Sequence, residues 1–296
     1  MRFRGKPEAA INYFRQSVEL ANQQRERVPD IYRLIPSTLA ELSITYGLAG
    51  DFPEALEAID EGLACIEDLR DRLRRPTLMS IQGEIYTWVG QYDQARRQAE
   101  AALALGPQPW TWLLIPPYQA AHSYRVLGWV AMAEESYAEA QELLHKSVEN
   151  YKEGTPDEEN LAWSLAALGR AEYGLGNKEV AWESLLSALE TTVRMRAFVP
   201  LLHLVPIIAV VLSEEEDSGL RERAIETYAL AKSHPFCAKS KLIEDIAGRH
   251  VAEAANSLPE DVVTVAQATG RGLDWWKTAE TLLETLQQLR QDMVDV

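Results

Sequence analysis

A short turn motif returns along this chain at a nearly constant interval, and it limits the possible folds more than any other feature. Six copies start at positions 5, 50, 90, 135, 176 and 219, so they lie 45, 40, 45, 41 and 43 residues apart. In order, they read GKPEAA, GDFPEA, GQYDQA, ESYAEA, GNKEVA and GLRERA. The glycine supplies a left-handed residue that ends one helix, and the alanine five positions later lets the next helix approach closely. The motif therefore predicts helix–turn–helix units in series.

The helices on both sides of each turn carry small residues at matching positions. These residues stand seven places before the glycine position and seven places after the alanine: Ser43, Gly83, Gly128, Gly169, Gly62, Ala102, Ser147 and Ala188. Small residues at paired positions are what stacked antiparallel helices need in order to interlock. Aromatic residues follow the turn in three copies, and we expect them to pack beneath it: Phe52, Tyr92 and Tyr137.

With this pattern, residues 4–231 resemble the tetratricopeptide repeat architecture. The resemblance implies an all-α fold, namely a right-handed superhelical solenoid of antiparallel helix pairs. The period exceeds the ~34 residues of the standard repeat, which we attribute to longer helices and to inserted loops such as 106–117. Trp110 and Trp112 in that loop either form a lip over the groove or pin the loop. The opening helix reads as the second helix of a repeat whose first helix is missing, as in a fragment of a longer chain.

The rest of the chain, where the motif fades, predicts a different arrangement. We expect the repeats to occupy residues 1–231 and a C-terminal helical cap, packed on the solenoid, to occupy residues 232–296. Gly270 and Gly272 are expected to form a turn before the last helix. The helices predicted within the cap cover 239–255, 259–267 and 274–291.

Residues 232–296 also resemble the C-terminal ends of STAND-type NTPases and related transcriptional regulators, including MalT-like activators. In those proteins, long-period helical repeats follow an NTPase module, and in some members they bind the inducer or partner that releases autoinhibition. The resemblance implies a bacterial sensor domain that binds a small-molecule inducer, or a protein or peptide partner, in its concave groove. Binding would then be relayed to an upstream NTPase module in the full-length chain.

Composition excludes several classes of protein. Apolar residues make up 47% of the chain and charged residues 25%, which is typical of a soluble globular protein and not of a disordered one. The formal net charge of -16 repels phosphate, so we expect binding neither to nucleic acid nor to an anionic membrane. The most apolar stretch, 197–212, is too short to span a bilayer and predicts a fully buried helix. The only cysteines, Cys65 and Cys237, favour a reducing cytoplasm and buried structural thiols.

The motifs of common catalytic and cofactor sites are absent from the sequence. It contains no G-x-x-x-x-G-K-[ST] loop to hold a nucleotide phosphate, and its five histidines are scattered without metal-ligand spacing. His234 and Cys237, in HPFC, come nearest to a nucleophile pair, but their position predicts a turn at a helix end. We therefore expect no cofactor, no metal and no enzymatic activity, and an enzyme of unknown type is kept only as a third class of function.

Binding in the concave groove is the stronger prediction. In this architecture the first helix of each repeat lines the groove, and the residues projected to point inward are Glu84, Trp88, His122, Arg125, Trp129, Trp163, Arg170 and Tyr173. Tryptophan and arginine dominate recognition hot spots. A flat ring can stack on a sugar or a peptide aromatic, and a guanidinium can pair with a carboxylate or phosphate. Packing between repeats explains any single one of these residues as well as ligand contact does.

Two functions therefore stay open at this point. The leading hypothesis is the sensor domain of a larger bacterial signalling ATPase or transcription regulator, and the alternative is a free-standing scaffold that gathers partner proteins through peptide segments. An enclosed pocket ringed by tryptophan and arginine would favour a small ligand. A continuous groove with a polar clamp rich in asparagine or lysine would favour the scaffold, and the projected positions hold no such clamp.

Overall fold

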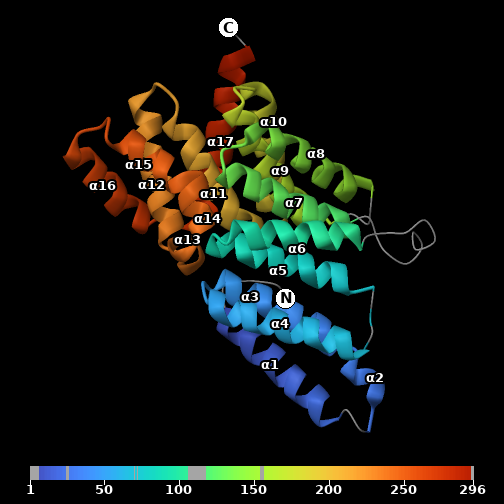
Figure 1. Cartoon of the computed structure of the whole chain (residues 1–296). Helices are drawn as coiled ribbons and strands as arrows, with labels where there is room; N and C mark the ends of the chain where they lie inside the picture. Colours follow the sequence, from blue (N-terminus) through green and yellow to red (C-terminus); the bar gives the residue numbers. More distant parts are fainter. Residues whose placement is uncertain are drawn as a thin grey trace.

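A computed structural model gives the fold of the chain and describes residues 7–24, 27–69, 71, 73–105, 118–153 and 157–294. Every regular element within these ranges is a helix. Figure 1 shows α1 to α10 stacked in chain order from blue to yellow-green, with α11 to α16 to one side of the stack and α17 beside α10. The predicted loop 106–117, with Trp110 and Trp112, lies outside the described residues.

The described residues contain five helix pairs. The first four form the stack and are each joined by one of the motif turns, whereas the fifth lies beside the stack. The pairs are α3 (Ile35–Leu48) with α4 (Phe52–Leu69), α5 (Arg75–Val89) with α6 (Tyr92–Ala104), α7 (Tyr118–Ala133) with α8 (Tyr137–Glu153), α9 (Glu158–Gly174) with α10 (Lys178–Met195), and α11 (Phe198–Ser213) with α12 (Ser218–Lys232). Two helices precede them, α1 (Pro7–Gln23), which packs against α3, and the short α2 (Pro29–Tyr32).

The turns have the backbone conformation that the motif predicts in four of the six copies. Gly50, Gly90 and Gly176 have φ angles of 79°, 83° and 80°, and Glu135, which replaces glycine in its copy, has a φ of 58°. All four are left-handed, a conformation that suits glycine and costs other residues energy. The predicted helix ends at these positions are therefore confirmed.

The other two copies differ. Gly219 does not end a helix but lies inside the first turn of α12, so that prediction was wrong. The reason is the N-cap residue Asp217, whose Oδ1 accepts a hydrogen bond from the Leu220 backbone N–H at 2.9 Å, so that the helix starts at Ser218, one residue before the glycine. Gly5, in the opening copy, lies outside the described residues.

Close approach within the pairs depends on the small residues. A Cβ atom added to Gly128 would lie 2.6 Å from Leu144 Cγ, and one added to Gly169 would lie 2.7 Å from Leu185 Cγ. At Ser147 the close approach of the two helices permits a hydrogen bond. Its Oγ donates to the Ala121 carbonyl oxygen at 2.8 Å across the α7–α8 contact. The predicted interlocking of paired helices at small residues is thus confirmed at these positions.

Helix α11 is the most completely buried element of the chain, as its apolar sequence predicts. All of its residues except Phe198 are buried, and it contacts α9, α10, α12 and the later helices α15 and α17. An apolar surface on every side of a helix is stable only when neighbours cover all of it. Among the described residues, no helix has both the length and the apolar character needed to cross a bilayer.

The C-terminal part contains more breaks than predicted. It consists of α13 (Pro235–Lys239), α14 (Lys241–Ile243), a π-helical turn η1 (Glu244–Gly248), α15 (Arg249–Ala255), α16 (Glu260–Arg271) and α17 (Trp275–Val294). The helix expected over 239–255 is interrupted at Ser240. The expected turn at Gly270 was wrong, because Gly270 lies inside α16, where the helix crosses the Glu226 carbonyl of α12 too closely for any side chain.

Residues 235–249, which we call the crossing segment, lie over the turns of three successive pairs. Lys239 Nζ donates to the Gly50 carbonyl oxygen at 3.1 Å, beside the first turn. The Tyr92 hydroxyl, just after the second turn, donates to Asp245 Oδ2 at 2.7 Å. At the third turn, Arg249 Nη2 lies 2.8 Å from the Glu135 carboxylate. The C-terminal part therefore contacts repeats that are far away in sequence.

Gly128→Ala tests the close approach inside the pairs. The added methyl group overlaps Leu144, and crowding of this kind in a packed core costs about 1–3 kcal/mol. We expect the free energy of unfolding, measured by urea denaturation followed by circular dichroism, to fall by that amount. Gly272→Ala is the matched control, because its added Cβ meets nothing closer than the Thr269 carbonyl oxygen at 3.5 Å. Equal stability of the two variants would contradict the packing argument.

Candidate binding site in the concave groove

Aromatic side chains fill the centre of the groove. Trp88 from α5, Trp129 from α7 and Trp163 from α9 are each at most 4% exposed. The His203 ring of α11 lies between two of them, with its centroid 5.6 Å from that of Trp129 and 4.4 Å from that of Trp163. Phe236 of α13 packs against Trp88 at 5.4 Å and against His203 at 5.0 Å. The chain therefore supplies its own contacts to the tryptophans predicted to face a ligand.

The His203 ring fits this apolar setting in its neutral form. Burial lowers the pKa of His203 to about 4, so the ring carries no charge at neutral pH. Its Nδ1 lies 3.2 Å from the Val199 carbonyl oxygen one turn earlier in α11. Its Nε2 is buried and has no hydrogen-bond partner among the described residues. His203 is therefore a core histidine bonded at one ring nitrogen, which agrees with the structural interpretation of the histidines from the sequence.

A cavity of about 270 Å³ opens beside this cluster. Four of the eight predicted groove residues line it, Glu84, His122, Arg125 and Trp163, so helices α5, α7 and α9 do bring these four together. Other lining residues come from α3, α5, α8, α11 and the start of α9: Glu41, Ile44, Thr77, Ile81, Tyr151, Asp157, Glu159, Asn160 and Val199. The cavity is thus shared by the first helices of several successive pairs.

A buried ionic network forms one wall of the cavity. Glu84 Oε2 lies 2.6 Å from His122 Nε2, and Glu84 Oε1 lies 3.2 Å from Arg125 Nη2. Burial alone would raise the pKa of Glu84, but the positive charge of Arg125 and the contact with His122 lower it to about 2. Glu84 is therefore ionised at neutral pH, and Arg125 needs it because an unpaired buried guanidinium would be very costly.

Arg125 is held by partners from three helices although its side chain is fully buried. Its Nη1 donates to Asn160 Oδ1 at 2.9 Å and to the Tyr151 hydroxyl at 3.3 Å. The guanidinium carbon lies 4.0 Å from the centroid of the Trp163 ring, which is the geometry of a cation–π contact. These contacts fix the orientation of both Arg125 and Trp163 at the cavity.

The structure places the remaining predicted residues elsewhere. Trp88 and Trp129 belong to the aromatic cluster and do not line the cavity. Arg170 Nη2 donates to the Tyr137 hydroxyl at 3.0 Å, and the Tyr173 hydroxyl donates to Glu215 at 2.8 Å. Ligand contact by these four residues stays a prediction, and in this structure all four are buried among protein atoms.

Sequence reasoning missed several cavity residues. Tyr151 belongs to α8, the second helix of its pair. The prediction considered only the first helix of each pair and therefore did not include it. Asn160 and Asp157 lie at the start of α9, where Asp157 Oδ1 accepts from the Asn160 backbone N–H at 3.1 Å. Asp157 just before a predicted helix, followed by two glutamates, is a helix-start signal in the sequence, and it would have placed both residues at the start of α9.

The cavity carries more negative than positive side chains. Four carboxylates line it, from Glu41, Glu84, Asp157 and Glu159, against one guanidinium, from Arg125. Within the described ranges, no group of three or more histidine, cysteine or carboxylate side chains has the arrangement of a metal site. The predicted turn at HPFC is a short helix start in which Cys237 is buried, and burial raises the pKa of its thiol. The burial expected for both thiols is confirmed for Cys237 and was wrong for Cys65, which is only partly buried on α4.

Comparison with known proteins identifies the fold of this chain but assigns it to no family. No protein-family model matches the chain, and no curated protein matches it. Among solved structures, a Rap protein in complex with Competence and Sporulation Factor matches all of this chain and 89% of its own, with 14% identity and a TM-score of 0.51. This likeness confirms the all-α, tetratricopeptide-like solenoid at the level of the fold.

Two further structures were matched with lower scores. BtubC (BKLC) from P. vanneervenii is 17% identical over 90% of this chain and 93% of its own, with a TM-score of 0.49. A kinesin light chain with TPR-like repeats from Podosopora anserina is 19% identical over 62% of this chain and 97% of its own, with a TM-score of 0.38.

Glu84→Gln tests the ionic network. The substitution removes the charge that balances Arg125, and breaking a buried ion pair from one side costs about 3–5 kcal/mol. We expect that loss in the free energy of unfolding at pH 7, measured by urea denaturation. Glu158→Gln is the control, since its ion pair with Arg194 lies on the surface and should contribute less than about 1 kcal/mol. Similar losses in both variants would contradict the network's role.

The pH dependence of the same comparison follows from the lowered pKa of Glu84. A carboxyl group with a depressed pKa in the folded state stabilises the protein above its ordinary value of 4.5, and this contribution disappears as pH falls toward about 2. The stability gap between wild type and Glu84→Gln should therefore be constant from pH 7 to about 5 and shrink below pH 4.5. A gap that does not change down to pH 3 would show that Glu84 is not ionised in the folded protein.

Proposed function

We propose that this chain is a recognition domain that binds a peptide segment of a partner protein, with a basic side chain of that segment in the Glu84–Arg125 cavity. The observation that carries the proposal is the cavity itself, a pocket of about 270 Å³ shared by successive repeats beside a groove otherwise filled by the chain's own residues. In helical-repeat proteins, extended concave surfaces of this kind serve binding.

The charge of the cavity supports a basic peptide. Its carboxylates outnumber its cationic side chains, and the whole chain carries a net charge of -16. A lysine or arginine of the partner would add positive charge next to Asp157 and Glu159, which increases both the association rate and the selectivity for cationic partners. Trp163 adds a donor, because its indole N–H is buried and has no hydrogen-bond acceptor among the described residues. A carbonyl oxygen of a bound peptide is a suitable acceptor.

The Rap protein of the same fold was crystallised with Competence and Sporulation Factor. That complex supports the idea that this architecture can hold a ligand. The ligand of the present chain has to be identified by experiment. The division into repeats over 1–231 and a helical cap over 232–296 is part of the proposal. So is a cytoplasmic location, which the two free cysteines support.

Fluorescence anisotropy with labelled heptapeptide pools tests the proposal. One pool carries lysine or arginine at a fixed central position, and the other carries aspartate or glutamate there. We expect saturable binding of the cationic pool and at least about 10-fold weaker binding of the anionic pool, which corresponds to ~1.4 kcal/mol. Equal binding of the two pools would contradict the proposed charge preference.

Thr77→Arg locates the binding to the cavity. Thr77 lines the cavity, so an arginine there adds bulk and a like charge, and we expect the affinity for the cationic pool to fall at least about 10-fold. Thr281→Arg is the matched control, because it adds the same charge at an exposed position on α17. An equal affinity in the two variants would place the peptide elsewhere on the chain.

The finer hypothesis is that this recognition domain is the sensor of a STAND-type NTPase or a transcription regulator of the MalT-like kind. It rests on the resemblance of residues 232–296 and adds a small-molecule inducer as a second class of ligand, together with an upstream NTPase module. The complete reading frame tests it directly. A G-x-x-x-x-G-K-[ST] loop encoded upstream of these residues would support the sensor, and a reading frame without an NTPase module would favour the free-standing scaffold.

A further inference from the structure

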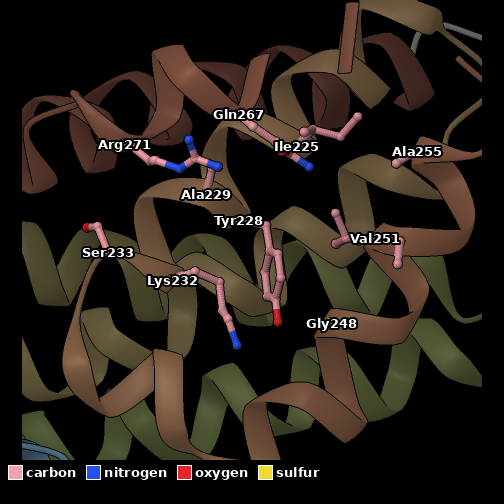
Figure 2. A pocket seen from close by; sticks show the side chains of 11 residues that line it. Ile225, Tyr228, Ala229, Lys232, Ser233, Gly248, Val251, Ala255, Gln267 and Arg271 are labelled. Carbon is pink, nitrogen blue, oxygen red and sulfur yellow. The ribbon is translucent and has the colours of Figure 1, made fainter. Parts of the chain in front are cut away.

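A second cavity, of about 430 Å³, lies in the C-terminal part of the chain between α12, α15 and α16 (Figure 2). It shares no lining residue with the Glu84–Arg125 cavity. Its walls are mainly apolar and include Ile225, Tyr228, Ala229, Val251, Ala252 and Ala255. Pockets of this size with apolar walls and few polar groups are the usual form of sites for small ligands.

Small residues at the contacts between these helices keep the space open. Three of the wall positions are alanines, Ala229, Ala252 and Ala255, and their short side chains leave the space between the helices unfilled. At Gly270, α16 touches the backbone of α12 so closely that no side chain fits, which fixes the crossing of the two helices. Gly248, in the π-helical turn η1, leaves room for the Tyr228 hydroxyl. Single π-helical turns are frequent at functional sites.

The two cationic side chains of the cavity lie on the same side of it, and Gln267 lies beside Ile225, between Arg271 and Ala255. Figure 2 shows Arg271 of α16 and Lys232 of α12 near Ala229, while Val251 and Ala255 lie toward the opposite end. The cavity therefore has an apolar body and a cationic end. This separation of apolar and charged surfaces matches an amphipathic ligand.

Only one of the two cations is available for a ligand. Lys232 Nζ already donates to the Ala238 carbonyl oxygen at 3.1 Å and pairs with Glu244 Oε2 at 3.4 Å. The Tyr228 hydroxyl donates to the same Glu244 oxygen at 3.2 Å. Arg271 forms no hydrogen bond or ion pair with any residue that the structure describes. The cavity thus offers one uncompensated guanidinium, which is complementary to a single negative charge.

We propose that this cavity binds a small amphipathic carboxylate, with its carboxylate on Arg271 and its hydrocarbon chain against the alanines of α12 and α15. A guanidinium can hold a carboxylate through two parallel hydrogen bonds. A dianionic phosphate monoester fits less well, because Glu244 already neutralises Lys232. The apolar walls favour a hydrocarbon chain of medium length over a polar metabolite such as a dicarboxylate.

Isothermal titration calorimetry with decanoate tests this proposal, with decyltrimethylammonium as the probe of equal chain length and opposite charge. Both are used below the concentrations at which they form micelles. We expect saturable binding of decanoate at one site per chain, and binding of decyltrimethylammonium at least about 10-fold weaker. Equal affinity for the two probes, or no saturable binding of decanoate, would overturn the proposal.

Two variants locate the decanoate. Arg271→Gln should weaken its binding about 3- to 5-fold, because Arg271 is exposed and a charge pair at an exposed position contributes up to about 1 kcal/mol. Ala252→Phe, at a wall position open to solvent, should abolish binding by filling the cavity while the helical circular dichroism signal is retained. Arg97→Gln removes an exposed arginine of α6 and should leave the affinity unchanged. Unchanged affinity in Arg271→Gln would contradict the assignment of the carboxylate.

The same titration separates this proposal from the peptide-binding function. Thr77→Arg alters the other cavity and should leave decanoate binding unchanged, because the two cavities have no lining residue in common. Loss of decanoate binding in Thr77→Arg, with a normal circular dichroism spectrum, would place the decanoate in the concave groove and overturn the proposal.

Discussion

Within the α7–α8 and α9–α10 pairs the two backbones approach so closely that a methyl group at Gly128 or Gly169 would overlap a leucine of the partner helix. This contact sets the spacing of the solenoid, and the left-handed turns at Gly50, Gly90 and Gly176 allow the chain to reverse within the same short distance. The close contact within the pairs and the short turns between their helices together produce the groove. Because the pairs stack at a fixed spacing, first helices from successive repeats bring Glu84, His122 and Arg125 within hydrogen-bond reach.

Local patterns were readable from the sequence because local forces determine them. The left-handed turns, the buried 197–212 helix and the small residues between paired helices follow from backbone sterics and from apolar surface alone. Gly219 and Gly270 show the limit of this reasoning. Asp217 caps α12 before Gly219, so the helix has already started at that glycine. Gly270 lies inside α16 because the contact with α12 leaves no room for a side chain. A glycine in the sequence therefore does not by itself indicate a turn.

The candidate site was predictable only in part, for a different physical reason. Helical periodicity predicted which faces of α5, α7 and α9 point inward. Two residues on those faces, Arg125 and Trp163, do line a cavity. It could not show what lies opposite that face. His203 and Phe236 occupy the space in front of Trp88 and Trp129, and their positions depend on contacts between segments far apart in sequence. Those contacts have no periodic signature, because each is made once.

The crossing segment changes how this solenoid can deform. In a simple repeat array each unit touches only its neighbours, so the array bends at every junction and can unfold from either end. Here one stretch of the chain is bonded beside three successive turns, through Lys239, Asp245 and Arg249. Bending between the first three pairs would have to break these bonds together. This end of the array is therefore stiff, and it is coupled in its unfolding to residues almost two hundred positions later.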